Sequence, residues 1–359
     1  MAHLLLAGYL GCGNLGDDAM MLGFLHGLGG GHDVTVLSGN PEETFRLYGL
    51  PSVPRRDMGA VKQAIYTCDA LVFPGGSVFQ DVTSLKSVGY YSQLVRLAKA
   101  AKKPVAMVGQ GVGPLNRYFG KQMAVGAFNA ADAIVVRDPG SAALLRQLGV
   151  KTPVRVAADP VFLLPKPAER EDQTSFQVGE MRTVGLAPRP LGKRTKDVAQ
   201  LFADLARLLF QGNFMPVLIE MDREEDGDLI LQINKLQGGK VPDLRKVQTP
   251  MQLQQRIARM DSVIAMRLHA GVLATTVGVP PFMVSYDPKV TAFANLLDVA
   301  TAPSIEGLTA QRLYENFVMF AKERERVLKV LERRTGELRK QAELNVEAVV
   351  ECLRGAPGS

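Results

Sequence analysis

The stretch HLLLAGYLGCGNLGDDAM (residues 3–20) joins a short apolar run to a glycine-rich loop and then to a helix-forming segment. The apolar run is continuous and does not alternate with polar residues, as expected of a strand covered on both faces. Gly8, Gly11, Gly13 and Gly16 would let backbone N–H groups and the helix N-terminus approach an anionic or polar ligand. This strand, loop and helix predict an α/β fold with a parallel sheet.

The same loop has a simpler explanation than a cofactor site. Its glycine spacing departs from GxGxxG, and the acidic residue expected about 20 positions later would have to be Asp33. A tight turn with Asp17 capping the following helix accounts for the residues equally well. We therefore expect no nucleotide cofactor at this loop.

Continuous apolar runs recur along the chain in two series, with helical segments between them. The first series predicts strands at residues 3–8, 33–38, 69–73, 104–109, 132–137 and 154–157. A polar stretch with two prolines, residues 165–182, then predicts a linker. The second series predicts strands at residues 183–187, 215–219, 244–248, 262–266 and 281–285. Each series is typical of a doubly wound parallel sheet, in which ligands bind at the carboxyl ends of the strands.

The two series set the expected domain boundaries. We expect an N-terminal Rossmann-like domain over residues 1–170 and a C-terminal Rossmann-like domain over residues 183–305, facing a ligand cleft. Residues 306–359 form a charged helical segment that could pack back on the first domain. A chain of 359 residues is longer than one compact core usually holds, which agrees with two domains.

The composition excludes several classes of protein. Hydrophobic residues make up 47% of the chain, yet no apolar run is long enough to span a membrane, and the first residues lack the basic region of a secretion signal. Three distant cysteines, Cys12, Cys68 and Cys352, favour a reducing, cytoplasmic setting, and no cluster of His, Cys, Asp or Glu has metal-ligand spacing. The net charge of +6 suits an anionic substrate, and no basic stripe with aromatic residues indicates nucleic acid.

Two further glycine-rich loops follow predicted strands and should lie at the same edge of the first sheet. They are FPGGSVFQD (residues 73–81) and GQGVGPL (residues 109–115). With the first loop, they suggest one wall of a cleft that a substrate approaches at the level of the backbone. The candidate residues of this wall are Gly11, Asn14, Asp17, Gly75, Gly76, Asp81, Gln110 and Gly111.

One arginine ends a predicted strand of the first series. In VVRDPGS (residues 135–141), Arg137 precedes Asp138 and Pro139, which are typical of the N-cap and first position of a helix. Arg137 is a candidate for binding an anion at the strand end, and its alternative role is a structural salt bridge.

A cation and an imidazole end a predicted strand of the second series. In SVIAMRLHAG (residues 262–271), Arg267 and His269 are two residues apart, so an extended backbone would direct both side chains the same way. Arginine can bind a carboxylate or phosphate through two hydrogen bonds, and histidine can transfer protons near neutral pH. Lys289, in SYDPKV (residues 285–290), ends the next strand at the same edge. The alternative for His269 is a core histidine.

Five of these motifs together resemble the polysaccharide pyruvyl transferase family. In chain order they are GYLGCGNLGDDAM, GQGVGPL, VVRDPGS, MRLHA and SYDPKV. The chain is most similar to the bacterial branch that pyruvylates secondary cell-wall polymers for S-layer attachment. The resemblance implies a fold like that of GT-B glycosyltransferases, with two Rossmann-like domains and a cleft. It departs from the family at Cys12, where members often have an aromatic residue.

The resemblance also implies an activity and a set of site residues. Members transfer the pyruvyl group of phosphoenolpyruvate to a sugar as a cyclic ketal, without a metal, so phosphoenolpyruvate is a substrate and no cofactor is expected. The implied acceptor is a lipid-linked saccharide with a residue of the N-acetylmannosamine type. Asp17 and Asp81 could orient its hydroxyl groups. The implied donor-binding residues are Arg137, Arg267, Leu268, His269 and Lys289, with His269 and Arg267 as the catalytic pair.

Two alternatives from other classes stay open. A nucleotide-sugar glycosyltransferase of cell-envelope polysaccharide synthesis would share the fold, and Glu220 or Asp222 could then bind the nucleotide ribose. A non-enzymatic scaffold of wall assembly would leave the titratable residues at the strand ends unexplained.

A lipid-linked acceptor would also require a location near a membrane. We expect weak peripheral contact with the inner membrane face through basic residues, and a homo-oligomer is compatible with the sequence. The basic residues considered for this contact are Arg55, Arg56, Lys102 and Lys103.

Overall fold

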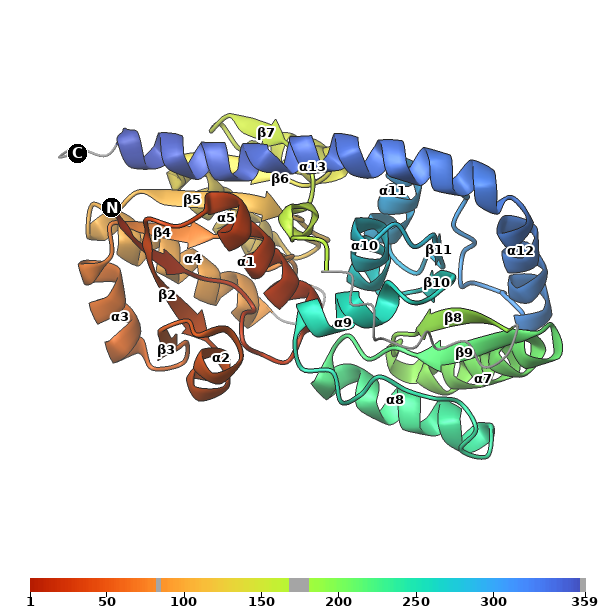
Figure 1. The fold of residues 1–359 in the computed structure, drawn as a ribbon. Helices are drawn as coiled ribbons and strands as arrows, with labels where there is room; N and C mark the ends of the chain where they lie inside the picture. Colours follow the sequence, from red (N-terminus) through yellow and green to blue (C-terminus); the bar gives the residue numbers. More distant parts are fainter. Residues whose placement is uncertain (82–84, 168–180, 356–359) are drawn as a thin grey trace. The chain divides into compact units, whose positions relative to one another are not determined.

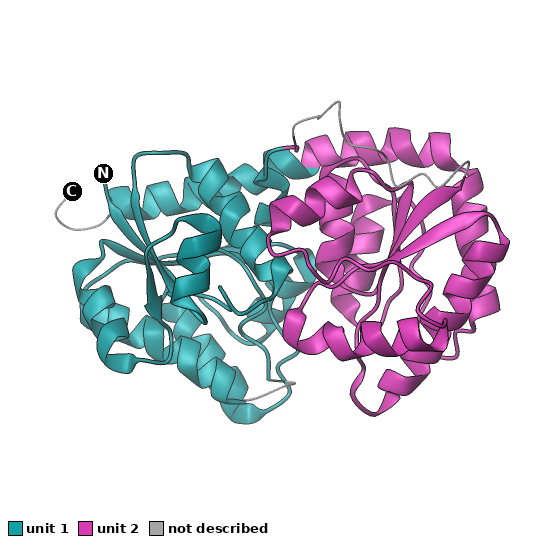
Figure 2. Ribbon diagram, turned by 60° about the horizontal axis from the view of Figure 1, so that its bottom comes forward, with its two compact units in different colours: residues 1–165, 338–359 teal, residues 166–337 magenta. Residues whose placement is uncertain are grey.

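The computed structural model describes residues 1–81, 85–167 and 181–355. The chain divides into two compact units, which Figure 2 colours separately. Unit 1 comprises Met1–Pro165 together with Leu338–Ser359, and unit 2 comprises Lys166–Glu337. Residues 306–337 therefore belong to unit 2, whereas the sequence pattern grouped them with the rest of the C-terminal segment. Most of the linker expected at residues 165–182 lies outside the described residues.

Unit 1 contains a seven-stranded parallel sheet in the order β3-β2-β1-β4-β5-β6-β7. The six strands predicted for this unit are confirmed. The seventh, β3, was not predicted, because it is short, contains a proline and has no apolar run. The strands are β1 (His3–Leu6), β2 (Asp33–Ser38), β3 (Ser52–Pro54), β4 (Ala70–Phe73), β5 (Val105–Gln110), β6 (Ala133–Val136) and β7 (Val154–Val156).

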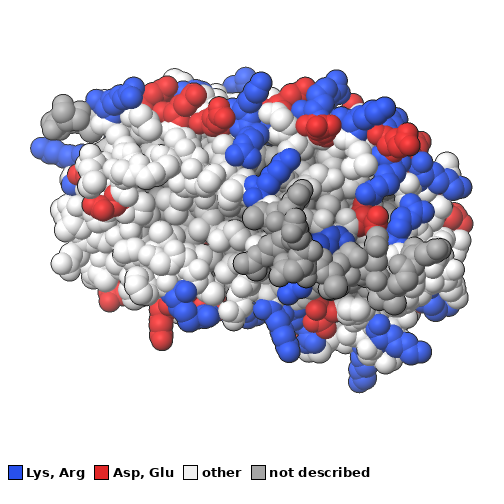
Figure 3. Space-filling view, viewed as in Figure 1, with Lys and Arg blue, Asp and Glu red and all other residues white. Residues whose placement is uncertain are grey.

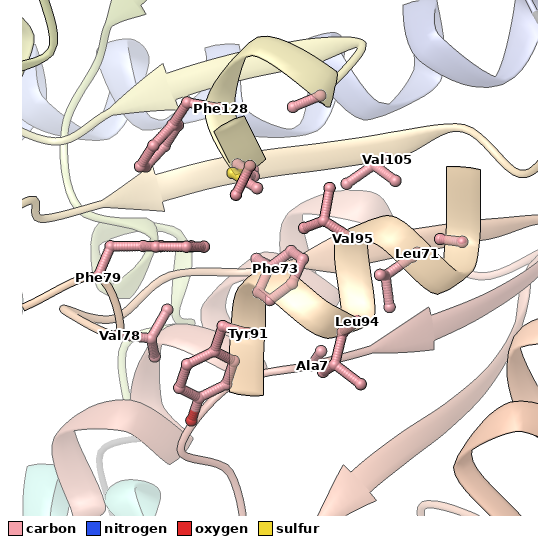
Figure 4. Close-up of a cluster of buried hydrophobic side chains, with 14 of the residues drawn as sticks. Ala7, Leu71, Phe73, Val78, Phe79, Tyr91, Leu94, Val95, Val105 and Phe128 are labelled. Atoms are coloured by element: carbon pink, nitrogen blue, oxygen red, sulfur yellow. The ribbon is translucent and has the colours of Figure 1, made fainter. Parts of the chain in front are cut away.

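Helices cover both faces of this sheet because its strands alternate between two cores. In β1, Leu5 faces the core beneath α3, α4, α5 and α6, where the rings of Phe79 and Phe128 lie 4.8 Å apart (Figure 4). Leu4 and Leu6 face the other core, beneath α1 and the C-terminal part of the last helix, α13 (Arg324–Arg354). The helices of unit 1 are α1 (Leu15–Leu28), α2 (Pro41–Tyr48), α3 (Met58–Thr67), α4 (Leu85–Ala100), α5 (Tyr118–Ala130) and α6 (Pro139–Gln147), with a 3-10 turn at Pro160–Leu163.

Unit 2 contains a smaller parallel sheet of four strands in the order β11-β10-β8-β9. The strands are β8 (Arg182–Ala187), β9 (Phe214–Leu218), β10 (Ser262–Ala265) and β11 (Pro281–Met283). The helices are α7 (Thr195–Gln211), α8 (Arg223–Leu236), α9 (Pro250–Ile257), α10 (Leu268–Thr276), α11 (Pro288–Leu297) and α12 (Ala310–Lys322), with a 3-10 turn at Gly192–Arg194 (Figure 1).

The strand predicted at residues 244–248 is wrong. The chain meets the end of β9 at an isolated bridge between Asp243 and Leu218, where the N–H of Leu218 donates to the carbonyl of Pro242 and the N–H of Leu244 donates to the carbonyl of Leu218. It then turns, because the N–H of Val247 donates back to the carbonyl of Leu244. Two adjacent cations, at 245 and 246, interrupt the apolar run that a buried strand needs.

The last helix, α13 (Arg324–Arg354), contributes to both units. In unit 2, Thr335 Oγ1 lies 3.4 Å from the carbonyl oxygen of Thr275. In unit 1, Ala348 and Val349 are buried in the sheet core, and Asn345 Nδ2 donates to the carbonyl of Ala158 at 2.9 Å. Lys and Arg side chains mix with Asp and Glu side chains along the exposed side of this helix (Figure 3). Among the described residues, no helix is both long and apolar enough to cross a membrane.

Candidate active site

The four strands of unit 2 run parallel, so their carboxyl ends meet at one edge of the sheet. A polar residue follows each strand within three positions: Arg189 after β8, Glu220 after β9, Arg267 after β10 and Tyr286 after β11. The loops after β8 and β10 are joined, because the N–H groups of Met266 and Arg267 donate to the carbonyl of Ala187 at 2.9 and 3.2 Å. This edge is where ligands of such folds bind.

A buried aspartate fixes the guanidinium of Arg267. Arg267 is 7% exposed, and its Nε donates to Oδ1 and Oδ2 of Asp226 at 3.0 and 3.1 Å, while Nη2 also donates to Oδ1. Asp226 is fully buried, and its Oδ2 accepts from the N–H groups of Met221 and Asp222 at 3.1 and 3.0 Å. The start of α8 therefore holds the carboxylate, and the carboxylate holds the arginine in one orientation.

Charge and burial oppose each other in this cluster. Burial alone would lower the pKa of Arg267, but the carboxylates of Asp226 and Glu225 raise it above its usual range, so the guanidinium stays charged. Burial raises the pKa of Asp226, and Arg267 acts in the opposite direction. Burial and the charge of Asp226 raise the pKa of Glu220 to about 7, although Arg245 lowers it. Glu220 thus changes its charge near neutral pH.

His269 and Lys289 each lie in the first turn of a helix. Arg267 is the N-cap residue of α10 and His269 follows in its first turn, so the strand has already ended at Ala265. The expected alternation along an extended backbone is therefore wrong for this pair, since residues two apart in a helix do not face each other. Lys289 lies in the first turn of α11, where Asp287 Oδ1 accepts from its N–H at 2.9 Å. Both sites have the N–H groups and dipole that favour anions.

In unit 1, Arg137 forms a structural salt bridge, which was the alternative to a role in binding an anion. Arg137 is 8% exposed, its Nη1 donates to Asp159 Oδ2 at 2.8 Å, and its Nη2 donates to Ser77 Oγ at 3.1 Å. A Cβ atom at Gly111 would lie 2.9 Å from Nη2 of Arg137, so the loop needs glycine there. The predicted helix start at Asp138, with Pro139 in its first position, is confirmed.

The glycine-rich loops of unit 1 are held by their own polar residues. Asn14, and not Asp17, caps α1: its Oδ1 accepts from the N–H groups of Gly16 and Asp17 at 2.9 and 3.3 Å. Asp18, which the sequence did not single out, accepts from the N–H of Gly11 at 2.9 Å. A Cβ atom at Gly76 would lie 3.1 Å from Asp17 Oδ1, which places these two loops side by side.

Two predicted residues of this wall are buried. Asp81 is 2% exposed, and its carboxylate accepts from the N–H groups of Asn116 and Arg117 at 2.9 and 2.6 Å. Gln110 is fully buried, and its Nε2 donates to the carbonyls of Phe73 and Val108. Both side chains therefore fix the loops that carry them. Gly75 adopts a φ of 142°, in the region that favours glycine.

The expectation that Arg55 is a basic surface residue for membrane contact is wrong. Its Nη1 lies 3.2 Å from Cys12 Sγ, its Nη2 donates to the hydroxyl of Tyr91 at 2.9 Å, and its guanidinium lies 5.4 Å from the ring centre of Tyr9 and 5.3 Å from that of Tyr90. Burial raises the pKa of the Cys12 thiol, while Arg55 lowers it. These partners, distant in the sequence, turn Arg55 inward.

The sequence missed the residues that surround Arg267. Asp226 and Glu225 lie on α8, far from Arg267 in the chain, and their pairing depends on the strand order. A local signal existed at DREED (residues 222–226), where an N-cap aspartate precedes a glutamate by three positions. Within the described parts of the chain, no group of three or more His, Cys, Asp or Glu side chains is placed to hold a metal ion.

Solved structures with a similar fold cover nearly the whole chain. The UDP-GlcNAc 2-epimerase of Neisseria meningitidis, bound to UDP-GlcNAc, matches with a TM-score of 0.62 at 11% identity over 98% of this chain and 100% of that one. HepE of Anabaena, in complex with UDP and glucose, matches with a TM-score of 0.63 at 13% identity over 99% and 100% of the two chains. The calicheamicin glycosyltransferase CalG4 matches with a TM-score of 0.54 at 13% identity over 100% of both. These likenesses confirm the predicted class, an α/β chain with two Rossmann-like units of the GT-B type.

Sequence comparison places the chain more narrowly. The amylovoran biosynthesis protein AmsJ of Erwinia amylovora is 24% identical over 244 residues, which cover 62% of this chain and 57% of that protein. The chain thus spans little more than half the length of this curated relative. A sequence profile of polysaccharide pyruvyl transferases matches residues 14–288, which include Arg137, Arg267 and His269. The chain belongs to the polysaccharide pyruvyl transferase family.

Proposed function

We propose that this chain transfers the pyruvyl group of phosphoenolpyruvate to a sugar of a polysaccharide precursor, forming a cyclic ketal and releasing phosphate. The observation that carries the proposal is the fixed, charged guanidinium of Arg267 at the start of a helix whose first turn contains His269. Membership of the family supports pyruvyl transfer. The fixed guanidinium of Arg267 and the helix N-termini of α10 and α11 support an anionic donor such as phosphoenolpyruvate.

The donor has two anionic groups, a carboxylate and a phosphate, and so requires several cations. Arg267 and the N–H groups at the start of α10 suit one of them. Lys289, at the start of α11, is the further cation that we assign to the donor, whereas Arg137 in unit 1 is held by Asp159 and Ser77.

The reaction requires one proton to be delivered to the donor and two to be removed from the acceptor. We assign His269 as the acid that protonates the methylene carbon, so that the C2–C3 π electrons form the new C–H bond and C2 becomes electrophilic. One sugar hydroxyl then attacks C2 and loses its proton, the bond from C2 to the phosphate oxygen breaks, and a second hydroxyl closes the ketal with loss of its proton. Proton transfer by a placed side chain contributes about 100- to 10,000-fold in rate.

For the acceptor, we propose an N-acetylmannosamine-type residue of a lipid-linked precursor of a secondary cell-wall polymer. The sequence motifs that resemble the S-layer-attaching branch support this choice. We place the acceptor at the glycine-rich loops of unit 1, where Gly11 and Asn14 are partly exposed. Gly76 and Gly111 are buried and serve the packing of these loops.

The proposal is tested by incubating the chain with phosphoenolpyruvate and a panel of aryl-tagged or lipid-linked amino sugars. We expect one acceptor to gain the mass of a pyruvyl ketal while an equal amount of phosphate is released. Phosphate release without an acceptor product, or no reaction with any acceptor, would contradict it.

The second candidate is a nucleotide-sugar glycosyltransferase, which the likeness to HepE in complex with UDP and glucose favours. The two candidates differ in the donor that stabilises the protein. Phosphoenolpyruvate should raise the melting temperature if the first proposal is right, and a UDP- or GDP-sugar should raise it if the second is right. In the structure, Asp222 caps α8 and Glu220 is 7% exposed, so neither is openly placed for a ribose.

A further inference from the structure

The guanidinium of Arg267 has two acidic partners of different character. Asp226 is fully buried and is held by two backbone N–H groups, so this carboxylate is part of the fold. Glu225 approaches from the same helix but its side chain is 45% exposed, and its Oε2 accepts from Arg267 Nη2 at 2.8 Å. The second carboxylate therefore lies on the solvent side of the arginine.

A second arginine approaches the same carboxylate oxygen. Nη2 of Arg189 lies 3.7 Å from Glu225 Oε2, and the Arg189 side chain is 31% exposed. Tyr286 steadies this arginine, because its hydroxyl accepts from Arg189 Nη1 and its ring centre lies 5.1 Å from the guanidinium carbon. Arg189 follows β8, Arg267 follows β10 and Tyr286 follows β11, which are three neighbouring strands of the sheet. Their carboxyl ends thus bring two guanidiniums to the same oxygen, Oε2 of Glu225.

Capping of α8 does not need Glu225. A glutamate three residues after an N-cap aspartate would ordinarily accept a hydrogen bond from the N-cap N–H. Here the N–H of Asp222 donates to Asp226 Oδ2 instead. Glu225 is thereby left to face the two arginines, and its ion pair with Arg189, in which both side chains are partly exposed, is of the weak kind.

The charges of these side chains leave room for an anion at the position of Glu225. Asp226 balances Arg267, Glu225 balances Arg189, and Asp222 adds a further negative charge near Arg267. If Glu225 turned out to solvent, Arg189 would lose its acidic partner, and N–H groups of two guanidiniums would face an incoming anion. A carboxylate or phosphate oxygen of a ligand presents the same acceptor that Glu225 presents.

We infer that Glu225 is a built-in competitor that occupies the anion position of the donor, and that Arg189 is a further donor-binding residue held ready by Tyr286. This inference rests on the proposed function for the identity of the donor, phosphoenolpyruvate. On binding, one anionic group of the donor takes the place of the Glu225 carboxylate between Arg267 and Arg189.

Isothermal titration of the full chain with phosphoenolpyruvate, and separately with inorganic phosphate, tests this. Glu225→Gln should tighten binding of both anions by about two- to fivefold, the range expected when an exposed ion pair no longer competes. The matched control is Glu224→Gln, which removes the same charge from the same exposed turn of α8 and should leave the dissociation constants unchanged. Arg189→Gln should weaken both by about tenfold or more. Thermal melts of each variant report whether it folds.

The outcomes separate the inference from the proposed function. If phosphate binds more tightly to Glu225→Gln while no variant binds phosphoenolpyruvate, the anion site stands and the proposed donor is wrong. If phosphoenolpyruvate binds but Glu225→Gln behaves like Glu224→Gln or binds less tightly, the inference is overturned and the proposed function stands. If neither anion binds the wild type or Glu225→Gln, the inference is overturned as well.

Discussion

Replacing Asp226 by asparagine should destabilise the chain more than any exposed substitution on α8. The carboxylate accepts three hydrogen bonds from Arg267 and two from backbone N–H groups, and it is fully buried. Asparagine keeps the shape and one acceptor oxygen but removes the charge, which leaves a buried guanidinium with incomplete compensation.

The magnitude follows from the environment of the pair. Breaking a buried ion pair by removing one partner costs about 3–5 kcal/mol. The lower end applies here because Glu225 remains 2.8 Å from Nη2 of Arg267 and shares its charge. For a compact unit of 150–250 residues, about 3 kcal/mol corresponds to a fall in melting temperature of about 6–12 °C.

The assay is thermal and urea unfolding followed by far-UV circular dichroism, since the chain has no tryptophan to report by fluorescence. Asp228→Asn is the matched control, an exposed aspartate on the same helix that should shift the midpoint little. The double variant with Arg267→Met should lose less stability than the sum of the single variants, because neither charge is then left alone. An Asp226→Asn protein within about 0.5 kcal/mol of wild type, or strict additivity in the double variant, would refute the reasoning.

Three further predictions concern the same edge of unit 2. Glu220 has its pKa raised from an ordinary 4.5 to about 7, so the folded state binds its proton more tightly and stability should fall as the pH rises from about 4.5 to 7. Glu220→Gln should weaken this dependence in melts recorded across that range, and an unchanged pH profile would contradict it. His269→Ala and His269→Gln should both lose about 100- to 10,000-fold in turnover while phosphoenolpyruvate still binds. If Gln restores the rate, His269 only binds an anion. If both variants fail to fold, His269 is a core histidine. Arg267→Lys should weaken donor binding strongly, because lysine cannot bond Asp226 through two nitrogens and still face the ligand, and an unchanged dissociation constant would count against the donor assignment.

The strands could be predicted because each is a local apolar run with both faces buried. Strand β3 (Ser52–Pro54) was missed because three residues with a proline at the edge of the sheet carry no such run. The strand predicted at residues 244–248 was wrong because one bridge to β9 is followed by a turn, which only the folded chain shows. Apolar runs in the sequence thus predict buried central strands, but they do not predict short edge strands or single β-bridges.

The site was predictable only in part, for a similar reason. Arg267 was singled out because it follows a buried strand within one short motif. Its partner Asp226 lies on a helix that follows β9, and β9 and β10 are separated in the sheet by β8, so no local pattern could join them. The N-cap of α1 could not be predicted from residue type either. Asparagine and aspartate both favour this position, and only the structure shows that Asn14 and not Asp17 occupies it.

The shared helix α13 has a consequence for how the chain is made. During synthesis, residues 1–165 leave the ribosome before all of unit 2, but the face of the first sheet that Ala348 and Val349 cover stays open until the end of α13 has emerged. Until then, the apolar side chains of Leu4 and Leu6 lack part of their cover. The nascent first unit therefore exposes apolar surface until synthesis is nearly complete, and translation that stops within unit 2 would release a sheet prone to aggregation.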